Sequence, residues 1–187
     1  MDNFNKLTEK AQEAVVRAQA IAREHSASEI DAEHLLAALL EDPEGVPALV
    51  LRQLGADSAG ISRQLTALLA KRSKVYGANE PGMGRDLRDI LTRAAKEAQN
   101  FMDDYISTEH LLLAIADAGK SEAAELLRSA GATRDAILKA LSAVRPLRRA
   151  SMAALRFCGV TPARARILPA SLSLSRASTS RRRSTVT

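Results

Sequence analysis

An internal duplication constrains this sequence more than any other feature. The tetrad Glu-His-Leu-Leu occurs at residues 33–36 and again 76 residues later, at residues 109–112. The same spacing aligns residues 10–66 with residues 86–142 without a gap. Identical residues recur in this register along its length: Arg17 and Arg93, Ala22 and Ala98, Ile30 and Ile106, Leu51 and Leu127, Gly55 and Gly131, Leu65 and Leu141. A repeat of this length predicts one structural unit that is built twice and packed against its own copy.

The residue types available for the core favour helices over sheets. Aromatic residues make up only 3% of the chain and Trp is absent, so the core must come from Ala, Leu, Ile and Val. Ala and Leu are strong helix formers, whereas sheets are rich in aromatic and β-branched residues. We therefore expect an all-α protein, a double four-helix repeat of eight helices about a pseudo-twofold axis, with no sheet in the first 144 residues.

Apolar spacing and capping residues predict four helices in the first repeat, residues 1–71. Thr8 and Asp31 are candidate N-caps for the first two helices, and Asp57 is one for the fourth. Gly55 follows the short third helix, at a position typical of left-handed backbone. The first repeat thus reads as a complete four-helix unit.

A connector rich in Gly and polar residues, 72–84, leads to the second repeat, 85–145. There Ser107 and Thr133 are the candidate N-caps at the positions equivalent to Asp31 and Asp57. Gly131 takes the position of Gly55 after the third helix. Two Ala-rich units packed about a pseudo-twofold axis bury a shared seam. Such packing also predicts a groove between the halves, where a ligand can bind. Residues 1–145 are therefore expected to form one domain.

Cysteine usage and hydropathy predict a soluble, cytoplasmic protein. Cys158 is the single cysteine, which excludes an internal disulfide framework and favours a reducing compartment. We find no secretory apolar segment near the start and no apolar run long enough to span a bilayer.

We predict no catalytic or metal-binding constellation. The Gly-Lys-Ser at residues 119–121 matches the end of a P-loop, but the motif requires a glycine five residues earlier, where Ala114 lies in a predicted helix. Without a Walker motif we expect no ATP hydrolysis and no enzymatic activity. His34 and His110 occupy equivalent positions, and no HxxxH pair or Cys–His signature accompanies them. We interpret them as ordinary helix histidines and expect neither a metal nor a cofactor.

Several segments resemble the Clp N-terminal repeat domain. They are LTEKAQEAV near the start, EHLLAALL in the second predicted helix and YISTEHLLLAI in the second repeat. The KVYG of the connector and the LRSAGA…ILKAL ending are more similar to the ClpB-type disaggregase than to the ClpA or ClpC forms. The resemblance covers about residues 3–145. It implies a double four-helix domain that precedes two ATPase modules, which use ATP. It also implies that this domain delivers unfolded or aggregated polypeptide to the pore of a hexamer.

The resemblance also implies three residues of a substrate groove: Thr8, Asp103 and Glu109. A groove with apolar walls and a few carboxylates would hold apolar segments flanked by Lys or Arg. Structural interpretations stay open beside this one: Thr8 as a helix cap, Glu109 as a complement to the helix dipole, and Asp103 as a solvated turn residue. Arg93 and Glu97, which are spaced as an i, i+4 pair, would make this groove more polar than is usual in the family.

Residues 146–187 differ in composition from the rest of the chain. All 22 Asp and Glu precede residue 145, together with 17 of the 27 Lys and Arg, which gives that part a net charge of −5. The ten positive charges from residue 145 onward are all arginines. We interpret this Arg/Ser/Ala-rich segment as a largely disordered tail that arose by a frameshift. The alternative is a basic arm that binds nucleic acid or a membrane surface, although Phe157 is its single aromatic residue.

Together these features predict a non-catalytic domain that recruits unfolded or aggregated polypeptide for a ClpB-like disaggregating chaperone of the stress response. Without ATPase modules we expect a monomer that does not bind membranes. Two other classes stay open. One is the adaptor-docking domain of a ClpA- or ClpC-like protease-associated unfoldase, and the other is a protein that binds nucleic acid through its tail.

Overall fold

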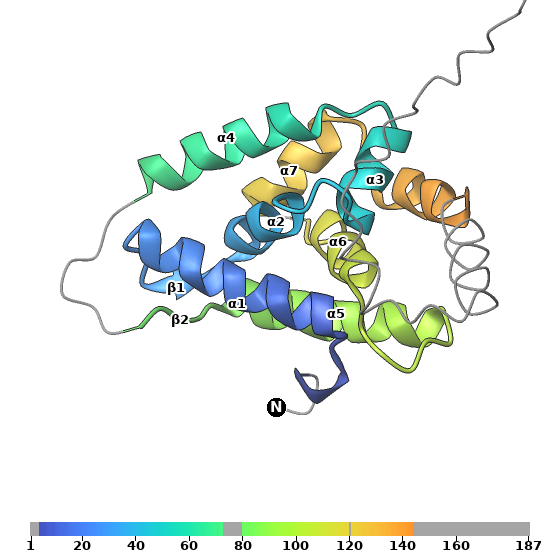
Figure 1. Ribbon diagram of the computed structural model, residues 1–187, viewed down its shortest axis with the longest axis horizontal. Helices are drawn as coiled ribbons and strands as arrows, with labels where there is room; N and C mark the ends of the chain where they lie inside the picture. The colour runs from blue at the N-terminus through green and yellow to red at the C-terminus, as the bar shows by residue number, and fades with distance from the viewer. Residues whose placement is uncertain (1–3, 73–79, 120, 144–187) are drawn as a thin grey trace, which may run out of the picture. The chain divides into compact units, whose positions relative to one another are not determined.

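The helices of the two halves begin at positions 76 residues apart (Figure 1). The computed structural model describes residues 4–72, 80–119 and 121–143. The paired helices are α1 (Glu9–Glu24) with α5 (Arg85–Asn100), α2 (Ala32–Leu40) with α6 (Thr108–Ala116), and α3 (Val46–Gln53) with α7 (Glu122–Ser129). The fourth pair is α4 (Ser58–Lys71) and the helical residues 134–143. Within these residues the predicted all-α, double four-helix repeat is confirmed.

The helix ends follow the capping chemistry that the sequence predicts. Thr8, Asp31 and Ser107 are the N-caps of α1, α2 and α6. Gly55 and Gly131 follow the C-caps of α3 and α7 with φ angles of 72° and 78°. Glycine adopts this left-handed backbone without the steric conflict that a Cβ introduces. The caps and stops therefore fix the same boundaries in both halves.

A pair of short parallel strands corrects the expectation that the first 144 residues contain no sheet. β1 (Glu29–Ile30), before α2, pairs with β2 (Gly82–Met83), before α5. A second parallel bridge joins Leu7, before α1, to Ile106, before α6. A shift of 76 residues converts one pairing into the other, so each lead-in segment pairs with the opposite half. These pairings satisfy backbone groups outside the helices, and strands of two residues leave no periodic signal in a sequence.

Helices α2 and α6 lie at the centre of the described fold and contact each other across the two halves. Their repeated tetrads contribute Leu35, Leu36, Leu111 and Leu112, none of which has exposed surface. Helix α1 packs on α2, and α5 packs on α6. The seam that the duplication predicts is therefore made by the repeated tetrad itself, and burial of its leucines holds the halves together.

Some predictions concern residues that the structure does not describe. They are the middle of the connector (73–79), Lys120, the end of the last helix, and the whole tail with Cys158. The described residues all belong to one compact unit. No helix among them is long and apolar enough to cross a bilayer.

Candidate functional site

The lead-in of the first half meets the loop between α5 and α6 through backbone hydrogen bonds. Residues Phe4–Lys6 form a 3₁₀ turn, η1, before α1. The N–H of Ile106 donates to the Lys6 carbonyl (2.7 Å), and the N–H of Thr8 donates to the Ile106 carbonyl (2.9 Å). We call η1, Thr8 and residues 101–109 the α5–α6 junction. All three of the predicted site residues lie in it.

Thr8 performs the capping role that its position predicts. Its Oγ1 accepts a hydrogen bond from the N–H of Ala11 (3.3 Å) in the first turn of α1. A hydroxyl group has a second lone pair and a proton of its own. The cap therefore leaves Thr8, which is partly exposed, with hydrogen-bonding capacity toward a ligand.

The orientation of Asp103 is fixed by a buried histidine. Nε2 of His110, a residue with no exposed surface, lies 3.2 Å from Oδ2 of Asp103. Nδ1 of the same ring accepts the N–H of Ser107 (3.0 Å), so in the neutral ring Nε2 carries the proton and donates to the carboxylate. The Phe101 ring packs against this imidazole with a centroid distance of 5.4 Å. Asp103 is thus a positioned carboxylate at the surface rather than a freely solvated turn residue.

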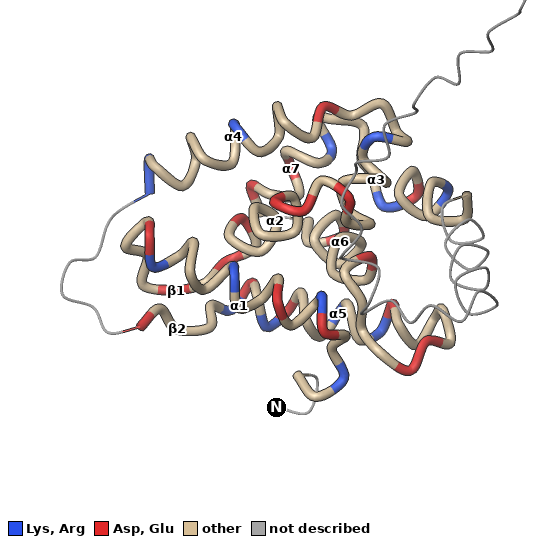
Figure 2. Tube along the Cα trace, in the orientation of Figure 1, with Lys and Arg blue, Asp and Glu red and all other residues tan. Residues whose placement is uncertain are grey.

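Apolar side chains are exposed beside these carboxylates. Met102 is 93% exposed, Tyr105 59% and Phe4 37%, and all three belong to the α5–α6 junction. Asp104 is also exposed, and Figure 2 shows the acidic residues of this loop where the chain passes from α5 to α6. On α1 and α5 the two signs of charge are interspersed. The junction therefore combines exposed apolar side chains with three acidic residues and one basic residue, Lys6 of η1.

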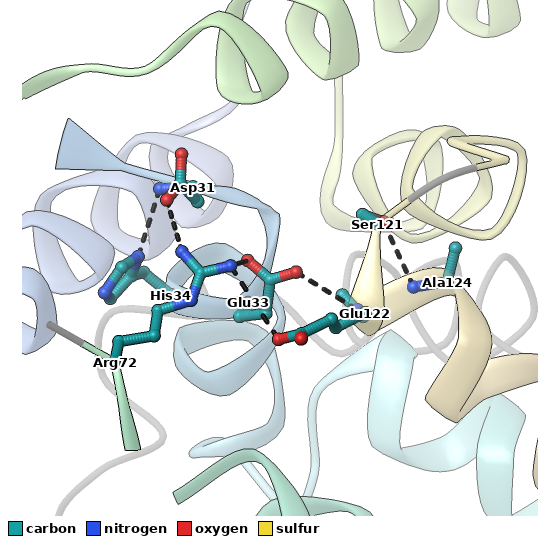
Figure 3. A network of polar contacts seen from close by, with 8 residues as sticks. Asp31, Glu33, His34, Arg72, Ser121, Glu122 and Ala124 are labelled. Carbon is teal, nitrogen blue, oxygen red and sulfur yellow. Dashed lines mark hydrogen bonds and ion pairs between the residues drawn. The ribbon is translucent and has the colours of Figure 1, made fainter. Parts of the chain in front are cut away.

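The equivalent of Glu109 in the first half, Glu33, has a structural role that the sequence analysis missed (Figure 3). Glu33 is 1% exposed, and its carboxylate accepts the Ala123 N–H at the start of α7 (3.2 Å) and pairs with Arg72 (3.1 Å). The Arg72 guanidinium also binds Asp31, and it lies 3.9 Å from Glu122. This network joins the end of α4 to α2 and to a helix of the other half.

Glu109 cannot repeat the bond that Glu33 makes to a helix N-terminus. The residue equivalent to Ala123 is Pro47 in α3, and proline has no backbone N–H. Glu109 is partly exposed in the first turn of α6, where a carboxylate is favoured by the helix dipole. The duplication thus places one glutamate in the core and its copy at the surface of the α5–α6 junction.

His34 is equivalent to His110 but lacks its acceptor. The Asp31 N–H donates to Nδ1 of His34 (3.0 Å), which matches the cap in the other half. Nε2 is buried without a hydrogen-bond partner among the described residues, because the position equivalent to Asp103 holds Ala27. Burial lowers the pKa of His34 from 6.5 to about 4. The D-x-x-H and S-x-x-H spacing, a variant of the capping box, is the sequence signal for both histidines.

Arg93 and Glu97 do not pair with each other, which corrects the expected i, i+4 pair. Arg93 binds Asp117 at the end of α6 (2.8 Å), and the equivalent Arg17 binds Glu41 in the same way (2.6 Å). Glu97 is 8% exposed and accepts hydrogen bonds from Arg134 (2.7 Å). Both side chains are thus occupied in tying α5 to neighbouring elements. The predicted groove between the halves stays a prediction.

The side chains of this region offer hydrogen bonding, charge pairing and apolar contact. The described residues contain no group of three or more His, Cys, Asp or Glu side chains that could hold a metal ion. Ala114, at the position where a P-loop needs glycine, lies inside α6.

The fold and the junction define a class of protein that the comparisons with known proteins identify. The profile described as "Clp repeat (R) N-terminal domain" matches residues 6–130. The chain belongs to this family of non-catalytic N-terminal domains. It is 42% identical over 147 residues to the chaperone protein ClpB of Corynebacterium diphtheriae, an alignment that covers 78% of this chain and 17% of that protein. The chain therefore spans about a sixth of the length of such relatives.

Solved structures share the fold. One is the Hsp104 N-terminal domain of Candida albicans, with a TM-score of 0.64 and 21% identity, over 73% of this chain and 89% of that one. Another is the ClpV N-domain in a complex with a VipB peptide, with a TM-score of 0.60 and 24% identity, over 71% of this chain and 82% of that one. At these identities the structures support the architecture, and the ClpB relatives support the chaperone family.

Proposed function

We propose that this domain recruits unfolded or aggregated polypeptide for a cytoplasmic, ClpB-like disaggregating chaperone. The polypeptide binds at the α5–α6 junction, through apolar side chains that carry a neighbouring Lys or Arg. Thr8, Asp103 and Glu109 contribute hydrogen bonds and negative charge. ATP hydrolysis belongs to the motor modules of the family rather than to this domain, which needs no cofactor to bind.

The observation that carries this proposal is the exposure of Met102 and Tyr105 beside carboxylates. Exposed apolar residues that gather in one region, unlike single ones such as Val16, are typical of interaction sites. Non-native chains differ from native ones in exposing apolar segments, and Lys or Arg within such a segment would pair with Asp103 and Glu109. The ClpV N-domain, which has a similar fold, binds a peptide, and this supports a peptide as ligand here.

Fluorescence anisotropy with the full chain tests the function. The probe is a labelled protein that is kept unfolded by reduced and blocked cysteines, and its native form is the control. We expect saturable binding to the unfolded form alone, weakened by salt because charges contribute. Equal binding to both forms, or binding to neither, would contradict the proposal. Preference for a folded adaptor or for duplex DNA would support the other two classes instead.

One substitution tests the site itself. Glu109→Gln removes a charge from the first turn of α6 and should weaken binding about two- to fivefold, as expected for an exposed charge pair. The matched control is Glu125→Gln, an exposed acid in the first turn of α7, outside the junction. Equal losses in the two variants would show that only total charge matters. Thermal unfolding of both variants confirms that each remains folded.

A further inference from the structure

Met102 has a backbone conformation that is unfavourable for its side chain. It follows the C-cap of α5 with a φ of 55°, and the Asp103 N–H bonds back to the Ala98 carbonyl (2.9 Å). This is the Schellman arrangement, in which glycine is the usual residue at this position. Gly55 and Gly131 occupy the corresponding positions after α3 and α7.

Backbone hydrogen bonds stabilise the turn at Met102, but the Met102 side chain contributes little to it. Left-handed backbone places Cβ too close to the following carbonyl for residues other than glycine. Some side chains offset this with a local hydrogen bond or with packing, but a thioether is a weak acceptor, and this one is 93% exposed. What this position presents to solvent is a large apolar side chain that contributes little to the packing of the fold.

The equivalent loop of the first half provides an internal comparison. Ser26 has the same left-handed backbone as Met102, with a φ of 54°. The residues equivalent to Asp103, Asp104 and Tyr105 are, in order, Ala27, Ser28 and Glu29. The first-half loop therefore has the same backbone and none of the exposed apolar side chains. The fold requires the loop shape but not the chemistry of the second copy.

Tyr105 and Phe4 are the other exposed apolar residues of the α5–α6 junction. Tyr105 precedes Ile106, whose N–H donates a hydrogen bond to Lys6 at the end of η1, and Phe4 begins η1. Asp104 is exposed in the same loop, and His110 orients Asp103. Residues 101–109 contain three acidic residues and no Lys or Arg. Charge complementarity therefore favours a partner segment with positive charge next to its apolar residues.

We infer that Met102, together with Tyr105, is the apolar anchor for the recruited segment, and that only the second half of the duplication carries this surface. One segment therefore binds per domain, despite the twofold repeat. The occupant is an apolar segment of a non-native chain that contains Lys or Arg. A methionine suits variable partners, because its flexible thioether side chain adapts to differently shaped apolar groups. This inference rests on the proposed function and specifies its site.

The test uses the full chain and a short labelled peptide of Phe, Leu, Lys and Gly that has no structure of its own. Met102→Gly removes the anchor and relieves the backbone, so the affinity should fall about tenfold. At the same time the midpoint of thermal unfolding should rise by about 2–5 °C. Ser26→Gly is the matched control, which should raise the midpoint similarly and leave the affinity unchanged.

Met102→Asn distinguishes the loss of the apolar side chain from a gain in loop flexibility. Asparagine tolerates left-handed backbone better than most residues and has no apolar side chain, so the loss of affinity should match that of Met102→Gly. Unchanged affinity in both Met102 variants would overturn the inference while the proposed function survives. An equal loss in Ser26→Gly would also overturn it. If the unsubstituted chain binds neither this peptide nor the unfolded protein, the proposed function fails and the inference fails with it.

Discussion

His34 and His110 show how one residue position has acquired two environments. Both rings are fully buried, and both accept the N–H of the helix N-cap through Nδ1. His110 also reaches Asp103, whereas His34 has no partner for Nε2 among the described residues. A buried donor without an acceptor costs free energy, because its bonds to water are lost and not replaced. Among the described residues, the first half therefore contains an unsatisfied buried nitrogen, Nε2 of His34, whereas the equivalent nitrogen of the second half has a partner.

Supplying the missing acceptor should stabilise the domain. Ala27→Asp places a carboxylate where Asp103 lies in the other half, and we expect the free energy of unfolding to rise by about 1 kcal/mol. Asp103→Ala is the reciprocal change, which should lower it by a similar amount. Urea unfolding followed by circular dichroism measures both. A loss of stability in Ala27→Asp would show that the two loops are less alike than their backbone suggests.

The lowered pKa of His34 predicts a pH dependence of stability. Burial favours the neutral ring, so the pKa falls from 6.5 to about 4, a shift that Arg72 and His25 enlarge and Asp31 opposes. The unfolded state then takes up a proton at higher pH than the folded state. The contribution of the neutral His34 ring to the free energy of unfolding is therefore fully present above pH 6.5. It decreases by about 3 kcal/mol as the pH falls to 4.

A variant without the titrating ring isolates this contribution. His34→Gln keeps an acceptor at the third helical position, as in an ordinary capping box, but does not titrate in this range. The pH slope between 6.5 and 4 should be shallower in His34→Gln than in the unsubstituted chain, as measured by urea unfolding at several pH values. Equal slopes would mean that His34 does not titrate on unfolding as its burial implies.

At the scale of elements, further contacts join the two halves besides the packing of α2 on α6. Lead-in segments pair across the halves, and Glu33 in α2 accepts a hydrogen bond from the N-terminus of α7. Arg72, just after α4, neutralises this buried carboxylate. Because a buried charge without its partner is strongly destabilising, the pair couples the end of the first repeat to the start of α7.

A double-mutant cycle measures this coupling. Arg72→Met should destabilise the domain, because it leaves the Glu33 carboxylate buried without a cation, and Glu33→Gln should also destabilise it. The double variant should be more stable than the sum of the two effects predicts, by about 1–2 kcal/mol, since neither partner is then left unpaired. Additive losses would show that the two side chains act independently, contrary to the 3.1 Å contact between them.

Element positions were largely predictable, whereas contacts between distant residues were not. The 76-residue register, the N-caps and Gly55 predicted the helix starts and stops, because these signals are local. The strand pairing and the Glu33–Arg72 pair depend on which residues the fold brings together across 39 positions or more. The expected pairing of Arg93 with Glu97 failed for the same reason, since Asp117 and Arg134 compete for these side chains.

The residues of the candidate site stay a prediction, and their geometry could not be predicted from the sequence. Thr8, Asp103 and Glu109 came from a family resemblance, and the structure places all three in the α5–α6 junction. The exposure and strain of Met102 could not be read from the sequence, because a methionine after a helix is most simply interpreted as part of the apolar core. Its significance depends on the comparison with Ser26, which needs the backbone angles of both loops.

At the scale of the molecule, the duplication supplies a symmetric framework and an asymmetric surface. The helices, the glycine stops and the strand exchange repeat in both halves. The residues that differ between the halves concentrate chemistry at one place, the α5–α6 junction, while the equivalent region of the first half is polar or buried.

The most direct test of this account is amide chemical-shift mapping by NMR of the full chain, titrated with the unfolded Phe/Leu/Lys/Gly peptide. We predict that the largest shifts fall in residues 4–8 and 101–109, with Met102 and Tyr105 among them. Residues 25–31 of the first half should change little. Shifts of similar size in both loops, or shifts that avoid the α5–α6 junction, would contradict the assignment of the binding surface to the second half.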